Sequence, residues 1–455
     1  MKVTYRLMAV ILLLLCLLGC TPETPGFGNA TPEQAYDQAR AALLTSPNQL
    51  IQYTWSLTRT VGQQEYTESA TGTASIGGIG TEDLKALLQE TLTYGTLRSD
   101  HTLTYSDGYA YSQLSDCTFT QPMEAADFLR RQLPAALLAR ALYQTMEVQT
   151  TKDGTLFTFT DPSQLENWVN APSGAQLSHA SGTATLDDKG LLVASTYTAT
   201  YSLGEANYHL EASIRSSAPA TLDLSVIQPE RYENVVSLTC LDAPKLLMRA
   251  VGDIFTAQNM TCAISETIYS QAIPLLRKRQ TTAAISGSGQ NMVASLDSTI
   301  QATIYQDQPT LSSQSLRFEG GICTSAVNGG EPSVQDGVTA ETMRTHIEDA
   351  ILSGLFATRY LAGAELMETE SLYILRFRGN DAYCTDLSGD IGAFLKMDLD
   401  GLSTSYETTE AAGYLAIHKQ TGLPEAMGMS FARTHVFSEE AHQLTYQLDQ
   451  TLKLS

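Results

Sequence analysis

The chain has 455 residues, enough for two or three domains, and 43% of them are apolar, enough for real hydrophobic cores. Its 27 basic and 49 acidic residues give a formal net charge of −22. This balance argues against binding to nucleic acid, whose phosphates require a basic surface, and against lying flat on anionic lipid.

The first 19 residues have the pattern of a secretory signal peptide. Lys2 and Arg6 form a short positive region, and the apolar run LMAVILLLLCLL follows at residues 7–18. A helix needs about 20 apolar residues to span a bilayer, so this run fits a signal peptide better than a membrane span. Residues 20–31, rich in Pro, Gly and Thr, are predicted to form a flexible tether.

The apolar run ends in LLGC, which resembles the lipobox of bacterial lipoproteins. That motif has an aliphatic residue three positions before the cysteine and a small residue directly before it. Leu17 and Gly19 supply these, with Leu18 between them, whereas Cys16 follows a leucine and does not fit. The resemblance implies cleavage before Cys20, a diacylglyceryl group on its sulfur, and anchoring to the extracytoplasmic side of the cell membrane. The alternative is an ordinary secretory signal with a chance cysteine.

The first half, residues 32–228, is predicted to open with the helix TPEQAYDQARAALL. Thr31 is placed to act as its N-cap, Pro32 takes the first helical position, and Gln34 lies three residues after the cap. Alternating strands follow, among them IQYTWSL and the hairpin LTYSDGYAYSQ, which turns at its Asp-Gly pair.

The same half continues with an apolar helix over residues 125–146, which Pro134 interrupts. The strand GTLFTFT comes next, followed by SQLENWVN, which is predicted to form a short helical segment. The half ends in long strands, two of which meet at a turn at Gly190 and Leu191.

A linker at residues 229–241 leads to the second half, residues 242–455, which is predicted to repeat this order. It opens with a helix over residues 243–256, where Asp242 has the role of Thr31. Strands, a second apolar helix over residues 339–361, the strand SLYILRFR, the short segment LSGDIGAFL and a Gly-Leu turn then follow in the same sequence. The chain is therefore interpreted as a tandem duplication.

The strands are rich in Thr, Tyr, Val and Ile and have hairpin spacing, which favours antiparallel sheets. The predicted fold class is α+β, with two tandem repeats that each pack a curved antiparallel sheet, a half-barrel, on α-helices. If the halves are separate domains, a fragment of residues 30–235 is expected to fold alone.

The pieces SDGYAYS, LDDKGLL and IHKQTGLPEAM, in this order of helices and strands, are similar to the LolA/LppX-like lipoprotein fold. The resemblance implies that each half is a half-barrel wrapped around helices, with a hollow that holds acyl chains in several members. This chain departs from the carriers of that family because it is doubled and is itself anchored. Binding or a structural role is therefore expected rather than shuttling.

We find no pattern that predicts catalysis, a metal site or a cofactor. The seven histidines have no metal-ligand spacing, and no G-x-S-x-G motif or P-loop is present. His435 and His442 are expected to face each other as a surface pair. The cysteines after Cys20 lack a C-x-x-C spacing and are expected to be mostly buried free thiols.

Seven aromatic residues on predicted strands are candidates for lining a cavity, although packing of the sheet against a helix is the alternative. They are Tyr53, Trp55, Tyr105, Tyr109, Tyr111, Tyr197 and Tyr201. Two functional hypotheses follow. The first is a non-catalytic lipoprotein that binds a lipid or another amphiphile in its half-barrels. The second is an envelope interaction or scaffold lipoprotein with filled cores and a protein partner.

Overall fold

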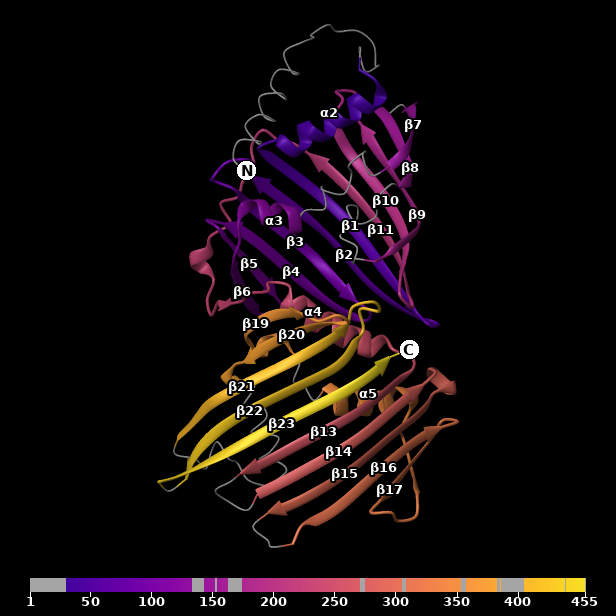
Figure 1. Cartoon of the computed structure of the whole chain (residues 1–455), viewed down its shortest axis with the longest axis vertical. Coiled ribbons are helices and arrows are strands. Elements are labelled where there is room, and N and C mark those ends of the chain that lie inside the picture. The colour runs from indigo at the N-terminus through magenta and orange to yellow at the C-terminus, as the bar shows by residue number, and fades with distance from the viewer. Residues whose placement is uncertain are drawn as a thin grey trace.

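The fold consists of two large curved β-sheets that follow each other along the chain, with helix α4 between them (Figure 1). The structure is a computed structural model. It describes the following residues: 30–132, 143–151, 154–162, 174–270, 275–304, 308–352, 357–382, 385, 405–437 and 439–454.

The helices of the described residues are few and short. The α-helices are α2 (Pro32–Thr45), α3 (Ala125–Gln132), α4 (Ala243–Thr256) and α5 (Ala340–Leu352), and the 3₁₀ helices are η3 (Pro229–Arg231), η4 (Gly289–Asn291) and η5 (Thr358–Tyr360). Within this part of the chain, none of the helices is long and apolar enough to cross a membrane.

Within the described ranges, twelve strands form the first sheet. They are β1 (Asn48–Val61), β2 (Gln64–Gly77), β3 (Lys85–Tyr94), β4 (Leu97–Ser106), β5 (Tyr109–Leu114), β6 (Cys117–Pro122), β7 (Tyr143–Thr151), β8 (Gly154–Pro162), β9 (Gln176–Leu186), β10 (Leu192–Leu203), β11 (Ala206–Ser217) and β12 (Val236–Ser237).

The second sheet has eleven strands in the part of the chain that the structure describes. They are β13 (Met260–Ser270), β14 (Leu275–Ser286), β15 (Val293–Ile304), β16 (Thr310–Glu319), β17 (Ile322–Val327), β18 (Ser333–Gln335), β19 (Leu361–Glu368), β20 (Leu372–Gly379), β21 (Ser405–His418), β22 (Pro424–Phe437) and β23 (Glu440–Leu454).

The two sheets have the same topology. In the first, the order β6-β5-β4-β3-β2-β1-β11-β10-β9-β8-β7 places the first strand against the last, and the second sheet has the matching order from β18 to β19. Their strand pairs are antiparallel, while the short linker strand β12 pairs with β6 in parallel. The predicted fold class, two tandem repeats of a curved antiparallel sheet packed on helices, is confirmed.

The opening helices differ in how they start. Thr31 forms the predicted capping box with Gln34, and α2 buries Tyr36 against Phe157 and Phe159 of β8. The same role predicted for Asp242 is wrong. Asp242 makes no side-chain capping bond, because its backbone angles are helical and not the extended ones that place a cap side chain over the helix start.

Both apolar helices end earlier than the sequence predicts. Helix α3 is described only as far as Gln132, and residues from Tyr143 form strand β7. Helix α5 ends at Leu352, and Leu361 begins β19. The apolar stretches assigned to the helices run on to residues 143–146 and to Leu361, which instead begin β7 and β19, so periodicity alone does not place the boundary.

Several predictions lie outside the described residues. These are the signal peptide, Leu17, Leu18, Gly19 and Cys20 of the lipobox, the break at Pro134, the segments SQLENWVN and LSGDIGAFL, and Cys384. Of the described cysteines, Cys117, Cys240, Cys262 and Cys323 are free, and the last two are buried.

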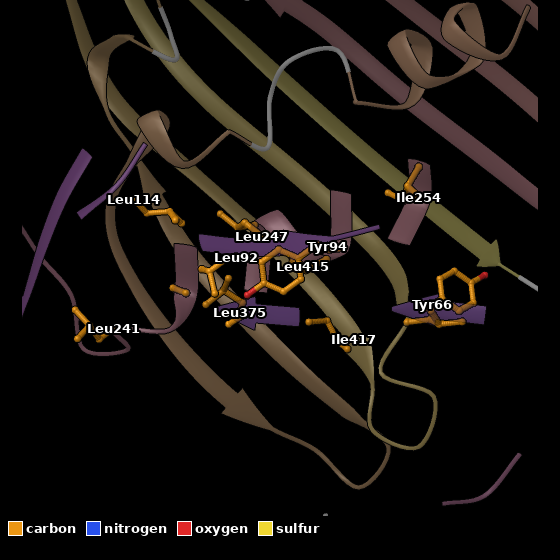
Figure 2. Packing of buried hydrophobic residues seen from close by; sticks show 14 of the residues in the cluster. Tyr66, Leu92, Tyr94, Leu114, Leu241, Leu247, Ile254, Leu375, Leu415 and Ile417 are labelled. Atoms are coloured by element: carbon orange, nitrogen blue, oxygen red, sulfur yellow. The ribbon is translucent and has the colours of Figure 1, made fainter. Parts of the chain in front are cut away.

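A single apolar core passes from one sheet to the other. Tyr66, Leu92 and Tyr94 of the first sheet and Leu375, Leu415 and Ile417 of the second belong to one cluster with Leu247 and Ile254 of α4 (Figure 2). Helix α4 contacts β2 and β3 on one side and β19 and β22 on the other. It therefore belongs to the packing of both repeats, although the sequence assigns it to the second.

Candidate functional site

The aromatic candidates divide between the two faces of the first sheet. The inner face, which the helices cover, carries Tyr53, Trp55, Tyr105, Tyr197 and Tyr201, and all of them except the half-buried Trp55 are fully buried. Tyr109 and Tyr111 alternate with the buried Ala110 and lie on the outer face, where Tyr109 is 45% exposed. The seven residues therefore do not line one common space.

The inner tyrosines are engaged by the protein itself. The Tyr105 hydroxyl donates to the Met123 carbonyl at 2.9 Å, and its ring lies 4.6 Å from that of Phe128 in α3. The Tyr201 ring stacks on Tyr208 at 4.8 Å, between adjacent strands. These contacts are those of a packed core.

Glu90 of β3 collects hydrogen bonds from three elements at the junction between the repeats. Its carboxylate accepts from the Tyr53 hydroxyl at 2.7 Å, from His101 Nδ1 at 2.7 Å and from Lys245 Nζ of α4 at 3.0 Å. Burial opposes ionisation, but the hydrogen bond from His101 and the charge of Lys245 prevail and lower the Glu90 pKa to about 2. The carboxylate is therefore charged and fully partnered.

Ser112, His101 and Glu90 are linked by hydrogen bonds in the same order as the nucleophile, base and orienting acid of a catalytic triad. Burial lowers the pKa of His101, so the ring is neutral, and the charged Glu90 assigns its proton to Nδ1. His101 Nε2 then accepts from the Ser112 hydroxyl at 2.9 Å. Ser112 is only 2% exposed, however, and a nucleophile needs access to its substrate. With Ser112 buried, these three residues form an internal hydrogen-bond network.

Sequence reasoning missed this network, although a signal for it exists. The hairpin of β3 and β4 pairs Glu90 with His101, and the hairpin of β4 and β5 pairs Leu103 with Ser112. Counting back from the Asp107-Gly108 turn gives the second register, and the first follows from a turn at Gly95. The signal in the sequence was that Glu90, His101 and Ser112, all polar, fall on the inner face of neighbouring strands.

A second polar cluster lies on the inner face near the turns of the first sheet. Arg59 of β1 donates to Asp253 of α4 at 2.6 Å and to the Thr421 carbonyl at 3.0 Å, while Arg249 lies 3.7 Å from Glu68. Burial raises the pKa of the Asp253 carboxyl, and the Arg59 and Arg249 guanidiniums oppose that shift. The cluster joins strand β1 to two segments of the second repeat.

The turn between β21 and β22, residues 419–423, also contacts the first sheet, and together with α4 it forms what we call the joint between the repeats. The Tyr208 hydroxyl donates to the Gln420 carbonyl at 2.6 Å, and Arg249 reaches the Gly422 carbonyl at 3.5 Å. Helix α4 approaches as closely as a glycine permits, because a Cβ atom on Gly252 would lie 2.6 Å from the Tyr94 carbonyl oxygen. One end of the first half-barrel therefore holds residues of the second repeat.

The outer face of the second sheet carries a hollow of about 630 Å³. It extends from Ser237 and Thr239 of the linker across β19 to β23, and Arg376, Tyr414 and Asp449 are part of its lining. Another hollow, of about 400 Å³, lies over Gly72 on the outer face of the first sheet and includes Arg215. A volume of several hundred Å³ is typical of small-molecule sites.

Metal ligands do not converge in the described part of the chain, where no group of three or more His, Cys, Asp or Glu side chains is placed to hold an ion. His435 and His442 face each other across β22 and β23 as predicted. The expectation of a surface pair is wrong for His435, which is fully buried because it lies on the inner face of its strand.

No protein-family model matches the chain, and no curated protein matches it. Among solved structures, LprF from Mycobacterium bovis is 12% identical and aligns with 42% of this chain and 95% of its own, with a TM-score of 0.25. MucB, solved in complex with MucA(peri), is 10% identical and aligns with 68% of this chain and 96% of its own, with a TM-score of 0.17. These likenesses are distant, and at such scores they carry no argument about function.

Proposed function

We propose that this chain is a non-catalytic lipoprotein, anchored through Cys20 on the extracytoplasmic side of a membrane, that acts by binding a partner at its outer surface. The observation that carries the proposal is the joint between the repeats. Helix α4 and the turn at residues 419–423 close one end of the first half-barrel with residues of the protein itself.

The inner-face tyrosines support the same reading of the first half-barrel. An acyl chain needs apolar walls that are free to contact it, whereas Tyr53 and Tyr105 are fixed by hydrogen bonds and packed against neighbouring side chains. The buried charges of Glu90 and Arg59 would also be poor neighbours for a hydrocarbon chain. These features fit a protein with a filled core that binds its partner on its outer surface better than they fit a lipid carrier.

A lipid-binding assay tests this proposal against its rival. The full chain, extracted gently from membranes, is expected to have the mass of the protein and its covalent lipid alone in native mass spectrometry. It is also expected to show no saturable uptake of a fluorescent fatty acid. A non-covalently bound lipid that this fatty acid displaces would contradict the proposal that the half-barrels are filled. It would support the hypothesis that they bind a lipid or another amphiphile.

The anchor is tested separately by substitution of the two N-terminal cysteines. Metabolic labelling with an alkyne fatty acid is expected to mark the native chain and Cys16→Ala but not Cys20→Ala. The reason is local, since Gly19 offers a small residue at the cut and Cys16 has a leucine in that position. Label that persists in Cys20→Ala would contradict the assignment.

A further inference from the structure

We propose that the hollow on the outer face of the second sheet binds an acidic saccharide, with Tyr414 as the stacking surface and Arg376 as the contact to a carboxylate. This inference deepens the proposed function and rests on it, because it names the chemistry of a ligand taken at the outer surface.

Five residues on adjacent strands form one row across the hollow. The strand registers place Glu365, Arg376, Tyr414, Gly428 and Asp449 opposite one another from β19 to β23. Residues opposite one another on paired strands share a face and lie within reach of each other. The row therefore brings a cation, a phenol ring and two carboxylates to one surface, with Glu365 opposite the cation and a glycine between the ring and Asp449.

The Tyr414 ring is held flat on this surface. A Cβ atom on Gly428 would collide with the ring, so the ring lies over the glycine, and its hydroxyl donates to Asp449 Oδ1 at 3.3 Å. Gln447 donates to the other Asp449 oxygen at 2.8 Å and fixes that carboxylate. A flat, half-buried ring offers its negative face to the C–H groups of a sugar, and the fixed polar groups beside it can bond sugar hydroxyls.

Arg376 supplies the charge preference. It is exposed, and among the described residues its guanidinium has no hydrogen bond or ion pair. Arg378, two residues along the same strand and about 7 Å away, lies over Gly363 and only approaches the Ala362 carbonyl at 3.5 Å. A free guanidinium beside a stacking ring favours a carboxylate, which it can bind through two parallel hydrogen bonds.

The position of the hollow favours a saccharide over a peptide. An extended peptide gains affinity by adding its backbone to an exposed sheet edge. Strands β20, β21 and β22 lie inside the sheet, where their backbone groups already pair with neighbours on both sides. Over these three strands only side chains remain for recognition, and at the edge strand β19 Thr239 of the linker already donates to the Ala364 carbonyl.

Calorimetric titration of the full chain in detergent tests the inference, with a galacturonate oligosaccharide as the probe. We expect the native chain to bind it more tightly than a neutral glucose oligosaccharide of equal length. Arg376→Gln and Tyr414→Ala should each weaken binding about tenfold or more. The matched control is Arg215→Gln, an exposed arginine in the hollow of the first sheet, which should change the affinity less than about twofold.

Each result of the titration either supports the inference or overturns it. Arg376 is exposed, so its substitution leaves the fold intact, and thermal melting checks this for each variant. Absence of binding to the acidic probe, equal loss in Arg215→Gln, or preference for a poly-glutamate peptide over the saccharide would overturn the inference. The fatty-acid assay and the saccharide titration have independent readouts. Absence of saccharide binding would not contradict the proposal that the half-barrels are filled. Uptake of fatty acid would contradict that proposal, but the saccharide site would still be tested by its own titration.

Discussion

Glu90 joins β1, β3, β4 and α4 through one carboxylate. Its hydrogen-bond partners are Tyr53, His101 and Lys245, and its side chain is only 8% exposed. The folded state holds the pKa at about 2, well below the ordinary value of 4.5. Because the folded pKa is the lower one, the stability that this group contributes is complete above pH 4.5 and is lost as the pH falls toward 2.

We therefore predict acid sensitivity that depends on this residue. The pKa difference corresponds to about 3 kcal/mol of unfolding free energy at neutral pH. The lowered pKa of His101 adds a loss that begins as the pH falls through 6.5, because protonating the buried ring costs stability. Glu90→Gln should reduce the free energy of unfolding at pH 7 and flatten its decline between pH 5 and 2, as measured by urea denaturation.

A matched control comes from the outer face of the same sheet. Glu211 also contacts a histidine, His209 at 3.1 Å, but its side chain is 62% exposed. Glu211→Gln should therefore leave both the stability and its pH dependence nearly unchanged. Equal pH profiles for Glu90→Gln and the native chain would mean that the junction carboxylate does not hold a depressed pKa.

At the scale of elements, α4 and the turn at residues 419–423 form the joint between the repeats, and Arg59 contacts both. Its side chain is 1% exposed and bonds Asp253 and the Thr421 carbonyl. Removal of one partner of a buried ion pair leaves an uncompensated charge, which costs far more than removal of an exposed one.

Arg59→Met should reduce the free energy of unfolding by about 3 to 5 kcal/mol. Arg317→Met is the control, because Arg317 pairs with Asp297 at 2.7 Å but is 51% exposed, and its loss should cost about 1 kcal/mol or less. Calorimetry of both variants measures the difference. We also expect the Arg59 variant to melt in two steps, and a single step with a small cost would contradict the coupling of the repeats through this joint.

At the scale of the whole molecule, the duplicated topology places each repeat on its own sheet, while the core continues between them through α4. The boundary at residues 229–241 remains a prediction, and the fragment of residues 30–235 tests it. This fragment keeps most of the first sheet but loses α4, which covers Leu92 and Tyr94.

We expect the fragment of residues 30–235 to melt at a lower temperature than the full chain and to bind a hydrophobic dye. Extension to residue 257 restores α4 and should raise the melting temperature and reduce the dye signal, because the apolar inner face is covered again. A fragment of residues 30–235 that melts cooperatively at the temperature of the full chain would show that the first repeat is complete without α4.

Local chemistry in the sequence determined much of this fold. The Thr31 capping box, the Asp107-Gly108 turn and the Gly190 and Gly422 turns at matching places gave the element order and the duplication, since each depends only on a few neighbouring residues. Strands β7 and β19 escaped prediction because their first residues, Tyr143 and Leu361, stand at the end of apolar stretches that the sequence assigns to helices.

Tertiary structure alone decided how the repeats and their side chains meet. Sequence alternation placed Tyr53 and Trp55 on one face, but it did not say whether that face encloses a ligand or the protein's own helix. The contact of Arg59 with Asp253 joins residues 194 positions apart, and the row from Glu365 to Asp449 depends on registers across five strands. Periodicity reports which face a residue occupies, whereas long-range pairing determines what lies opposite it.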